Sequence, residues 1–536
     1  MENQTNHYDY VIIGSGFGGS VSALRLSEKG YKVLVIEKGK KYDAEDFPAS
    51  NWNLKRWLWL PALRFFGFFK ITFYRHVSVL SGVGFGGGSL VYANTLPIPK
   101  KEFFEAKSWS HLANWEEELK PFYRTAKRML GVTKNPQLEF GDNVLKFVAK
   151  QIEKENKFEA TDVAVFFGEP EQTVPDPYFN GEGPERAGCN FCGACMIGCR
   201  YNAKNTLDKN YLFFAEKNGA EFLTEKEVYD IIPIKNNSQT TYKVKWKAST
   251  KLFKQKGEIT CNGVVFSGGV LGTIPLLLKL KDTSLPNLSE KIGSNIRTNS
   301  ESLLGVTTTD TKKDFSKGVA IGSIFHADKF SHLEAVRYPS GSGFWRTQML
   351  PMLDGKNWAI RLLKVIVEII SHPVKWAKLY FVKDWAKQTQ ILLFMQTLNN
   401  SLSFSKGWFR MKTKLESGKA PTAFIPEARK LAKEFAKIVE GEPGALISET
   451  LLGIPTTAHI LGGAVMGKDK KEGVIDKDNK VFGYKNMYVC DGSAISANPG
   501  VNPSLTITAL TERAMSKIPV RVKAFQTTEV LKTSEI

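Results

Sequence analysis

The sequence predicts an α/β fold organised in two lobes. Near the N-terminus, a buried strand, a glycine-rich turn, a helix and a second strand follow one another, at 8–13, 14–19, 20–30 and 32–36. This order is typical of a dinucleotide-binding βαβ unit. Three stretches at 228–234, 241–247 and 258–266 look like the strands of an antiparallel meander. The 536 residues exceed what one hydrophobic core usually organises, so we expect two domains or two interleaved lobes.

Each glycine of the N-terminal turn has a physical role. Gly14 allows the tight turn out of the strand, and Gly16 lets the backbone approach a pyrophosphate at the positive end of the helix. Gly19 lets helix and strand pack closely. Glu37 ends the second strand and can accept hydrogen bonds from ribose hydroxyls. The unit therefore predicts a dinucleotide site, but alone it does not distinguish FAD from NAD.

Composition places the chain among folded proteins with a basic surface. Lys and Arg number 73 against 54 Asp and Glu, an excess that suits nucleic acid, an anionic membrane or an acidic partner. No nucleic-acid motif accompanies it, so we expect no nucleic-acid partner. Residues 1–8 are polar, and no apolar run reaches the ~20 residues that span a bilayer. We therefore expect a cytoplasmic protein, with a peripheral position on the inner face of the membrane as the alternative.

Three later segments favour FAD. A second glycine loop occupies 81–94, His459 precedes Leu461-Gly-Gly463, and 491–503 contains Asp-Gly-Ser and Asn-Pro between a strand and a helix. With these motifs the chain resembles the glucose–methanol–choline (GMC) oxidoreductases and, within them, the bacterial cholesterol oxidase subgroup. The resemblance extends from residue 8 to 515 and includes a glycine-rich strand end at 268–277.

The resemblance implies a Rossmann-like FAD-binding domain assembled from split segments, and an α+β substrate domain built on a mostly antiparallel sheet. We expect the FAD domain at 8–95, 205–305 and 455–520. The substrate domain then takes 96–204 and 306–454, and 521–536 form a C-terminal tail.

The resemblance also implies which residues hold FAD. They come from the first glycine turn and the acid after it, from the second glycine loop, and from the C-terminal motif: Gly14, Ser15, Gly16, Phe17, Gly18, Gly19, Glu37, Gly86, Gly87, Gly88, Ser89, Asn94, Asp491, Gly492, Asn502 and Pro503. One position departs from the subgroup, which has Asn directly after the loop. Tyr92 stands there in this chain and Asn94 follows two residues later.

Alcohol oxidation requires a group that accepts the hydroxyl proton, and an imidazole that titrates near neutral pH suits that role. His459 and Asn502 match the family's positions for the proton acceptor and the amide that holds the hydroxyl. Cholesterol oxidases also use a glutamate to move a proton during isomerisation of a ring double bond. Glu334, in the alternating stretch 331–339, is the candidate, with His332 as a helper. Alternation alone would make Glu334 solvent-facing.

Cys189, Cys192, Cys195 and Cys199 have the C-x2-C-x2-C-x3-C spacing of bacterial ferredoxins. The run is followed by Arg200 instead of proline and has no second run to pair with. An iron–sulfur cluster, tetrahedral zinc and free thiols therefore stay open.

Two segments combine apolar and basic residues. No acid occurs from 47 to 101, and 52–74 interleave aromatic residues with Lys and Arg. A second segment, 359–370, predicts a helix with a narrow polar stripe that stops before Pro373, and 374–383 continue in the same style. Such segments suit a membrane surface or a substrate pocket.

The sequence thus predicts an FAD-dependent oxidoreductase for the CH–OH group of a hydrophobic alcohol, with a sterol as the expected substrate. Dioxygen or an electron carrier such as a quinone would reoxidise the flavin. The first alternative is an iron–sulfur flavoprotein dehydrogenase for another lipid or polyol. The second is a membrane-surface binding protein that keeps flavin as a structural ligand.

Overall fold

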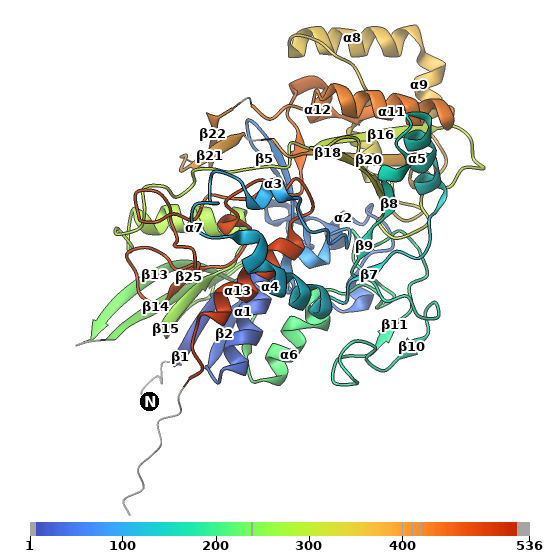
Figure 1. The fold of residues 1–536 in the computed structure, drawn as a ribbon. Helices are drawn as coiled ribbons and strands as arrows, with labels where there is room; N and C mark the ends of the chain where they lie inside the picture. Colours follow the sequence, from blue (N-terminus) through green and yellow to red (C-terminus); the bar gives the residue numbers. More distant parts are fainter. Residues whose placement is uncertain (1–6, 237–238, 399, 409–410, 419, 522–536) are drawn as a thin grey trace, which may run out of the picture.

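Two seven-stranded sheets organise the molecule (Figure 1). The structure is a computed structural model, and it describes residues 7–236, 239–398, 400–408, 411–418 and 420–521. The first sheet and its helices contain the N-terminal strand, and the second sheet occupies the upper right of Figure 1.

The first sheet is parallel at its centre and antiparallel at one edge. Its strands are β12 (Glu221–Leu223), β2 (Val33–Ile36), β1 (His7–Ile13), β15 (Lys256–Phe266), β14 (Gln239–Ala248), β13 (Lys226–Asn236) and β25 (Met487–Val489). The parallel strands β12, β2, β1, β15 and β25 bring the two ends of the chain into one sheet, and β14 and β13 extend β15 in antiparallel pairs. The predicted meander is therefore confirmed as part of the nucleotide-binding lobe.

Helices enclose this sheet. They are α1 (Phe17–Glu28), α4 (Trp115–Met129), α6 (Tyr211–Lys217), α7 (Val270–Lys281) and α13 (Ser504–Ser516), with α1 against α6 and α13, and α13 against α4. The predicted first helix is confirmed, but it begins at Phe17 instead of residue 20. The reason is that Gly16 is the N-cap, so the last glycines of the turn already lie in the helix.

The second sheet is antiparallel throughout. In spatial order it contains β19 (Met349–Pro351), β23 (Gly441–Leu446), β16 (Ser302–Thr308), β20 (Thr389–Gln396), β18 (Ser331–Val336), β17 (Ile321–Phe325) and β8 (Phe158–Ala160). Helices α5 (Phe140–Gln151) and α11 (Pro426–Ile438) cover one face. Because side chains alternate along a strand, Leu333 and Ala335 of β18 pack under these helices, whereas Val336 packs on the opposite face.

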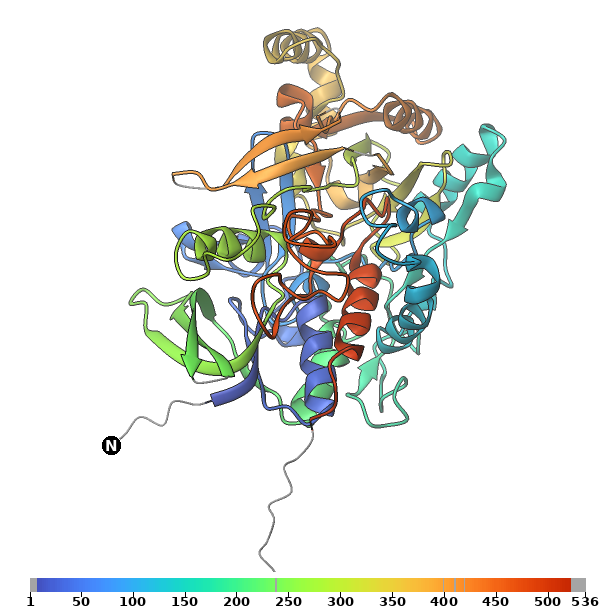
Figure 2. The same ribbon diagram turned by 60° about the vertical axis from the view of Figure 1, so that its left-hand side comes forward.

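A small three-stranded sheet of β5 (Phe69–Phe73), β6 (Ser78–Gly82) and β24 (Thr456–Thr457) lies beside the second glycine loop. Helices α12 (Ile447–Leu452), α8 (Trp358–Ser371) and α9 (Pro373–Tyr380) lie at the edge of the molecule that is farthest from the first sheet (Figures 1 and 2). None of the helices in the described ranges is long and apolar enough to cross a bilayer.

The predicted fold class is confirmed: a Rossmann-like α/β lobe made from separated segments, joined to a lobe on an antiparallel sheet. The limits of the two domains stay a prediction. The segment 96–204 contributes to both cores, because Trp109 and Trp115 pack in the core of the first sheet, whereas Val144 packs in that of the second. Of the predicted tail, residues 522–536 lie outside the described residues.

Candidate active site

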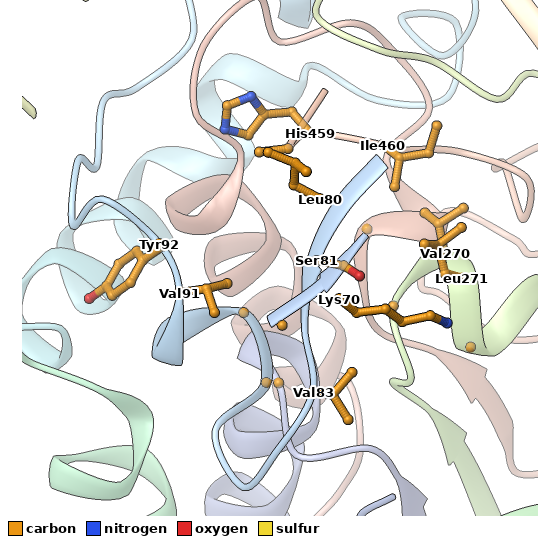
Figure 3. Close-up of a pocket in the computed structure, with 18 of the residues that line it drawn as sticks. Lys70, Leu80, Ser81, Val83, Val91, Tyr92, Val270, Leu271, His459 and Ile460 are labelled. Carbon is orange, nitrogen blue, oxygen red and sulfur yellow. The ribbon is translucent and has the colours of Figure 1, made fainter. Parts of the chain in front are cut away.

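A cavity of about 590 Å³ extends from the glycine turns of the first sheet to the open face of the second. Figure 3 shows the part of it that Tyr92, Val270 and His459 line. One end is lined by backbone-rich segments around Gly16, Gly88 and Gly269. The other end is lined by apolar side chains of the second sheet and its connections. His459 and Asn502 lie on the same cavity wall.

Two glycines at the polar end have no room for a side chain. Gly14 has φ +100°, and a Cβ there would lie 2.4 Å from the carbonyl oxygen of Ser267; a Cβ on Gly18 would lie 1.5 Å from that of Cys490. A Cβ on Gly16, by contrast, would meet no atom within 4 Å, because Gly16 faces the cavity. Gly16 also lacks a side-chain cap, and the first turn of α1 contains no acid. The positive end of α1 therefore faces open space, as an anion such as pyrophosphate requires.

A second helix also begins at the cavity. The chain turns at Gly269 between β15 and α7, and the cavity wall includes 267–273. Asp491 anchors this turn, because its Oδ2 accepts hydrogen bonds from the backbone N–H of Gly269 at 2.9 Å and from Thr273 Oγ1 at 2.5 Å. Burial raises the pKa of Asp491, and these hydrogen bonds oppose the rise.

Glu37 lies on the wall beside α1. Its Oε2 accepts hydrogen bonds from the backbone N–H of Ser15 at 3.0 Å and from Ser15 Oγ at 2.8 Å, and its Oε1 accepts one from the N–H of Gly39 at 2.7 Å. A carboxylate has about four acceptor positions, so one stays available for a ribose hydroxyl. Ser15 Oγ also accepts from the N–H of Gly86 at 3.1 Å, which ties the two glycine loops together.

The structure divides the predicted cofactor residues into two groups. Those on the cavity wall are Gly14, Gly16, Phe17, Gly18, Glu37, Gly87, Gly88, Asp491, Gly492, Asn502 and Pro503. Those that do not line the cavity are Ser15, Gly19, Gly86, Ser89 and Asn94. The first four of these support the loops: Gly19, for example, packs so closely that a Cβ would lie 1.9 Å from the carbonyl oxygen of Gly14.

Asn94 is buried beside Cys195, with φ +67°, and does not reach the cavity. Tyr92, Ala93 and Thr95 line it instead. Direct contact between Asn94 and a flavin is therefore not supported, and Tyr92, at the position where the subgroup has Asn, takes the place on the wall.

His459 is held by a buried carboxylate. Its Nδ1 lies 2.8 Å from Oε1 of Glu301, which is only 1% exposed. Glu301 in turn accepts hydrogen bonds from Thr457 Oγ1 at 2.7 Å and from the N–H of Ala458 at 3.1 Å. The pair leaves Nε2 of His459 as the ring nitrogen that is free of Glu301 and can accept a proton.

Opposing effects set the pKa of His459. Burial acts to lower it, but the charge of Glu301, the hydrogen bond to Glu301 and the charge of Glu334 act to raise it. The net result is a pKa above the ordinary histidine value.

Asn502 connects the cavity to a buried acid. Its Nδ2 lies 3.5 Å from Oε2 of Glu334, and Oε1 of Glu334 lies 3.5 Å from Nε2 of His332. Glu334 is fully buried and does not line the cavity, so it is neither solvent-facing nor in direct reach of a bound molecule. Asn502 Oδ1 has no hydrogen-bond partner among the described residues, which suits a ligand hydroxyl.

The apolar end of the cavity is formed mainly by the face of the second sheet that α5 and α11 leave uncovered. Aromatic residues close it from the side. The wall residues are Leu303, Ile321, Val336, Tyr338, Trp345, Met349, Trp385, Ile391, Leu393 and Leu446. This end suits a bulky apolar ligand.

The predicted metal site is not supported. Within the described ranges, no three His, Cys, Asp or Glu side chains form a group that could hold a metal ion. Cys189, Cys192, Cys195 and Cys199 form no disulfide, and burial raises the pKa of Cys192 to about 12. The segment instead forms part of the cavity wall through Met196.

Sequence reasoning missed three contributors to the site. Glu301 stands in an unremarkable stretch, 158 residues from the histidine that it holds, so no local pattern indicates it. Lys70 lines the cavity from β5, and burial lowers its pKa to about 8. The turn at 267–269 belongs to the glycine-rich strand end noted in the sequence, but it was not assigned a place at the cofactor site, which its strand–glycine–helix order could have indicated.

Comparison with known families agrees with this geometry. Two models described as GMC oxidoreductase match residues 184–299 and 409–511, and a model described as an NAD(P)-binding Rossmann-like domain matches 12–42. A cholesterol oxidase of Acinetobacter baumannii is 45% identical over 96% of this chain and 95% of its own length. A cholesterol oxidase of Mycobacterium tuberculosis is 41% identical over 96% of this chain and 91% of its own.

Among solved structures, pyridoxine 4-oxidase from Mesorbium loti superposes with a TM-score of 0.59 at 14% identity, over 95% of this chain and 98% of that one. At this identity the likeness concerns the fold alone.

Proposed function

The chain belongs to the GMC oxidoreductase family, whose members are FAD-dependent enzymes that oxidise alcohols, and on this premise we propose that it oxidises the hydroxyl group of a sterol. The two relatives above 40% identity are named cholesterol oxidases and match almost their full length. The observation that carries the proposal is the cavity, which combines a polar end at two helix N-termini, an apolar end and an imidazole held by a buried carboxylate.

Bound FAD supplies the acceptor for the two electrons that leave the carbinol carbon. The residues of the chain prepare the substrate for this step. His459 accepts the hydroxyl proton at Nε2, while Glu301 keeps Nδ1 oriented and balances the positive charge that forms. Asn502 binds the hydroxyl oxygen through its side-chain amide and keeps it beside the imidazole.

Glu334 has a separate role in this proposal. It lies behind Asn502 with His332 on its other side, each at 3.5 Å. A buried carboxylate with an imidazole neighbour can take a proton from one ring carbon and return it to another. Because Glu334 does not line the cavity, this isomerisation requires the Asn502 side chain to move aside or pass the proton.

The acceptor and the place of action also belong to the proposal. Dioxygen is the acceptor that the two relatives' names suggest, since an oxidase passes its electrons to oxygen. A sterol dissolves in membranes, so the enzyme acts as a peripheral protein at a bilayer surface. A carrier or quinone as acceptor is the alternative that the acceptor assay decides.

The decisive experiment follows anaerobic bleaching of the flavin absorbance with a panel of sterols, long-chain alcohols and sugars. We expect sterols to bleach the flavin fastest. Bleaching by sugars alone would overturn the proposed substrate. Readmission of oxygen should then restore the absorbance with one peroxide per sterol, whereas recovery only with a quinone would identify a dehydrogenase.

A matched pair of variants separates catalysis from binding. His459→Gln should keep the flavin and lose bleaching, whereas His372→Gln, at an exposed position outside the cavity, should behave as the wild type. Full activity of His459→Gln would favour the alternative in which flavin is only a structural ligand.

A further inference from the structure

Helices α8 and α9 form a pair at one extremity of the molecule, and α8 projects at the top of both views (Figures 1 and 2). Only Arg361 and Val365 of the fourteen residues of α8 are buried. At about 3.6 residues per turn, these two and Glu368 lie on one side of the helix, which faces the body.

The opposite side of α8 is apolar and exposed. Leu363 is 61% exposed and Ile370 72%, and Ala359, Ile366 and Val367 share their face. Val374 of α9 is 65% exposed. A helix on a globular protein normally presents polar residues outward, so this orientation is inverted.

The polar groups of the pair are satisfied on the inner side. Arg361 donates from Nε and Nη2 to the carbonyl oxygen of Leu451, at 2.9 and 2.7 Å. Glu368, the only acid within the two helices, accepts from Lys375 Nζ at 2.9 Å and from Trp376 Nε1 at 3.1 Å. The apolar face therefore remains outside, and the one acid of the two helices is paired on the inner side.

Cationic and aromatic residues surround this apolar face. Lysines stand on and beside the two helices at 356, 364, 378 and 383. Trp358 at one end and Tyr380 and Phe381 at the other are exposed. Apolar residues on one face, lysines beside it and aromatic residues at the ends are typical of helices that lie in the headgroup region of a membrane.

We propose that α8 and α9 dock the protein onto a lipid bilayer that contains anionic lipids, with the apolar face of α8 inserted at the headgroup boundary. The inference rests on the proposed function, because docking would serve to deliver a sterol from the bilayer to the cavity. The chain enters the pair after Met349 and leaves it before Trp385, and both residues line the apolar end of the cavity. Docking thus brings that end close to the membrane.

Charge distinguishes a bilayer from a second copy of the chain as the occupant of this face. Two copies that met face to face would bring their lysines together, and like charges that approach each other oppose association. An anionic bilayer instead attracts each lysine near its surface. The net charge of +19 also favours an anionic bilayer over a second copy of the chain.

The test is flotation of the full-length holoenzyme with vesicles of phosphatidylcholine containing roughly 30% phosphatidylglycerol. The variant Leu363→Glu/Ile370→Glu places two charges on the apolar face at exposed positions, so folding should be unaffected. The control Leu252→Glu/Phe253→Glu makes the same charge change on an exposed loop before β15. We expect the first variant to float about tenfold less than wild type and the control to float like wild type.

Equal flotation of wild type and the α8 variant, or an equal loss in the control, would overturn the proposal. So would sedimentation without lipid that finds a wild-type dimer and a monomeric α8 variant, because a second copy would then cover the face.

Activity separates this inference from the proposed function. The α8 variant should be slow only on sterol embedded in vesicles, with detergent-dispersed sterol oxidised normally. If no sterol is oxidised in either form, the proposed function fails while the flotation result still decides the docking.

Discussion

The carboxylate of Glu301 and the imidazole of His459 meet at 2.8 Å, between Oε1 and Nδ1, on the wall of the cavity. Glu301 is itself fixed by Thr457 and by the backbone of Ala458, so the histidine is held by the segment that carries it as well as by a residue far away in sequence. This arrangement determines that Nε2 is the ring nitrogen available to the substrate, because Nδ1 is occupied by the carboxylate.

The first prediction concerns Glu301→Gln. The charge of Glu301 raises the pKa of His459 against the effect of burial, so its removal lowers that pKa. Because the proton acceptor must be neutral, activity rises with pH through the pKa of His459. The acidic limb of the kcat/KM profile should therefore move to lower pH in the variant, while kcat falls by about tenfold to a hundredfold. Glu442→Gln, at an exposed edge of the second sheet, serves as the control. An unmoved acidic limb would contradict the role of Glu301.

The second prediction concerns Asn502→Leu. The variant keeps the volume of the side chain but removes the amide that binds the hydroxyl oxygen. We expect KM for sterol to rise and kcat to fall by roughly 10–100-fold, because both binding and orientation are lost. Steady-state kinetics with detergent-dispersed sterol measure this, and flavin content by absorbance checks that the cofactor is retained. Kinetics like those of the wild type would show that another group holds the hydroxyl.

The third prediction separates oxidation from isomerisation. Glu334→Gln keeps the shape of a fully buried side chain and removes its ability to take up a proton. The variant should still bleach its flavin with sterol within about tenfold of the wild-type rate, but the oxidised product should retain its original ring double bond. Product ultraviolet absorbance distinguishes conjugated from unconjugated ketones. Conjugated product formed at the wild-type rate would exclude Glu334 as the proton carrier.

Local patterns predicted the parts of the site that depend on the backbone, and missed those that depend on long-range packing. Gly14, Gly16 and Gly18 were predicted because a tight turn that brings a pyrophosphate to a helix N-terminus requires glycine. All three line the cavity. Glu334 was indicated by its place in a strand, but its complete burial follows from a second sheet that the sequence pattern does not position.

The cysteine run shows the same limit of local patterns. The four cysteines from Cys189 to Cys199 have the separation of a cluster motif, yet spacing does not fix the direction of each thiol. Met196, inside the run, faces the cavity, and Cys195 lies beside Asn94 and Lys204, so the segment is folded as a wall of the site. The same packing turns Asn94 away from the cavity where its motif indicated a contact.

The fourth prediction compares two glycines of the first turn. A Cβ at Gly18 would lie 1.5 Å from the carbonyl oxygen of Cys490, on a strand end of the same sheet, whereas a Cβ at Gly16 would meet nothing within 4 Å. Gly18→Ala should therefore destabilise the fold itself, since the clashing atom is backbone and must shift to admit the methyl group. Gly16→Ala should leave the fold intact and weaken FAD binding by about tenfold or more, because the added methyl group occupies the approach of the pyrophosphate. Thermal unfolding of the flavin-free proteins measures the first effect, and titration of those proteins with FAD measures the second.

If Gly16→Ala lowered the midpoint of thermal unfolding of the flavin-free protein as much as Gly18→Ala did, the turn would serve packing and not the cofactor. Wild-type FAD affinity in Gly16→Ala would place the pyrophosphate away from the start of α1.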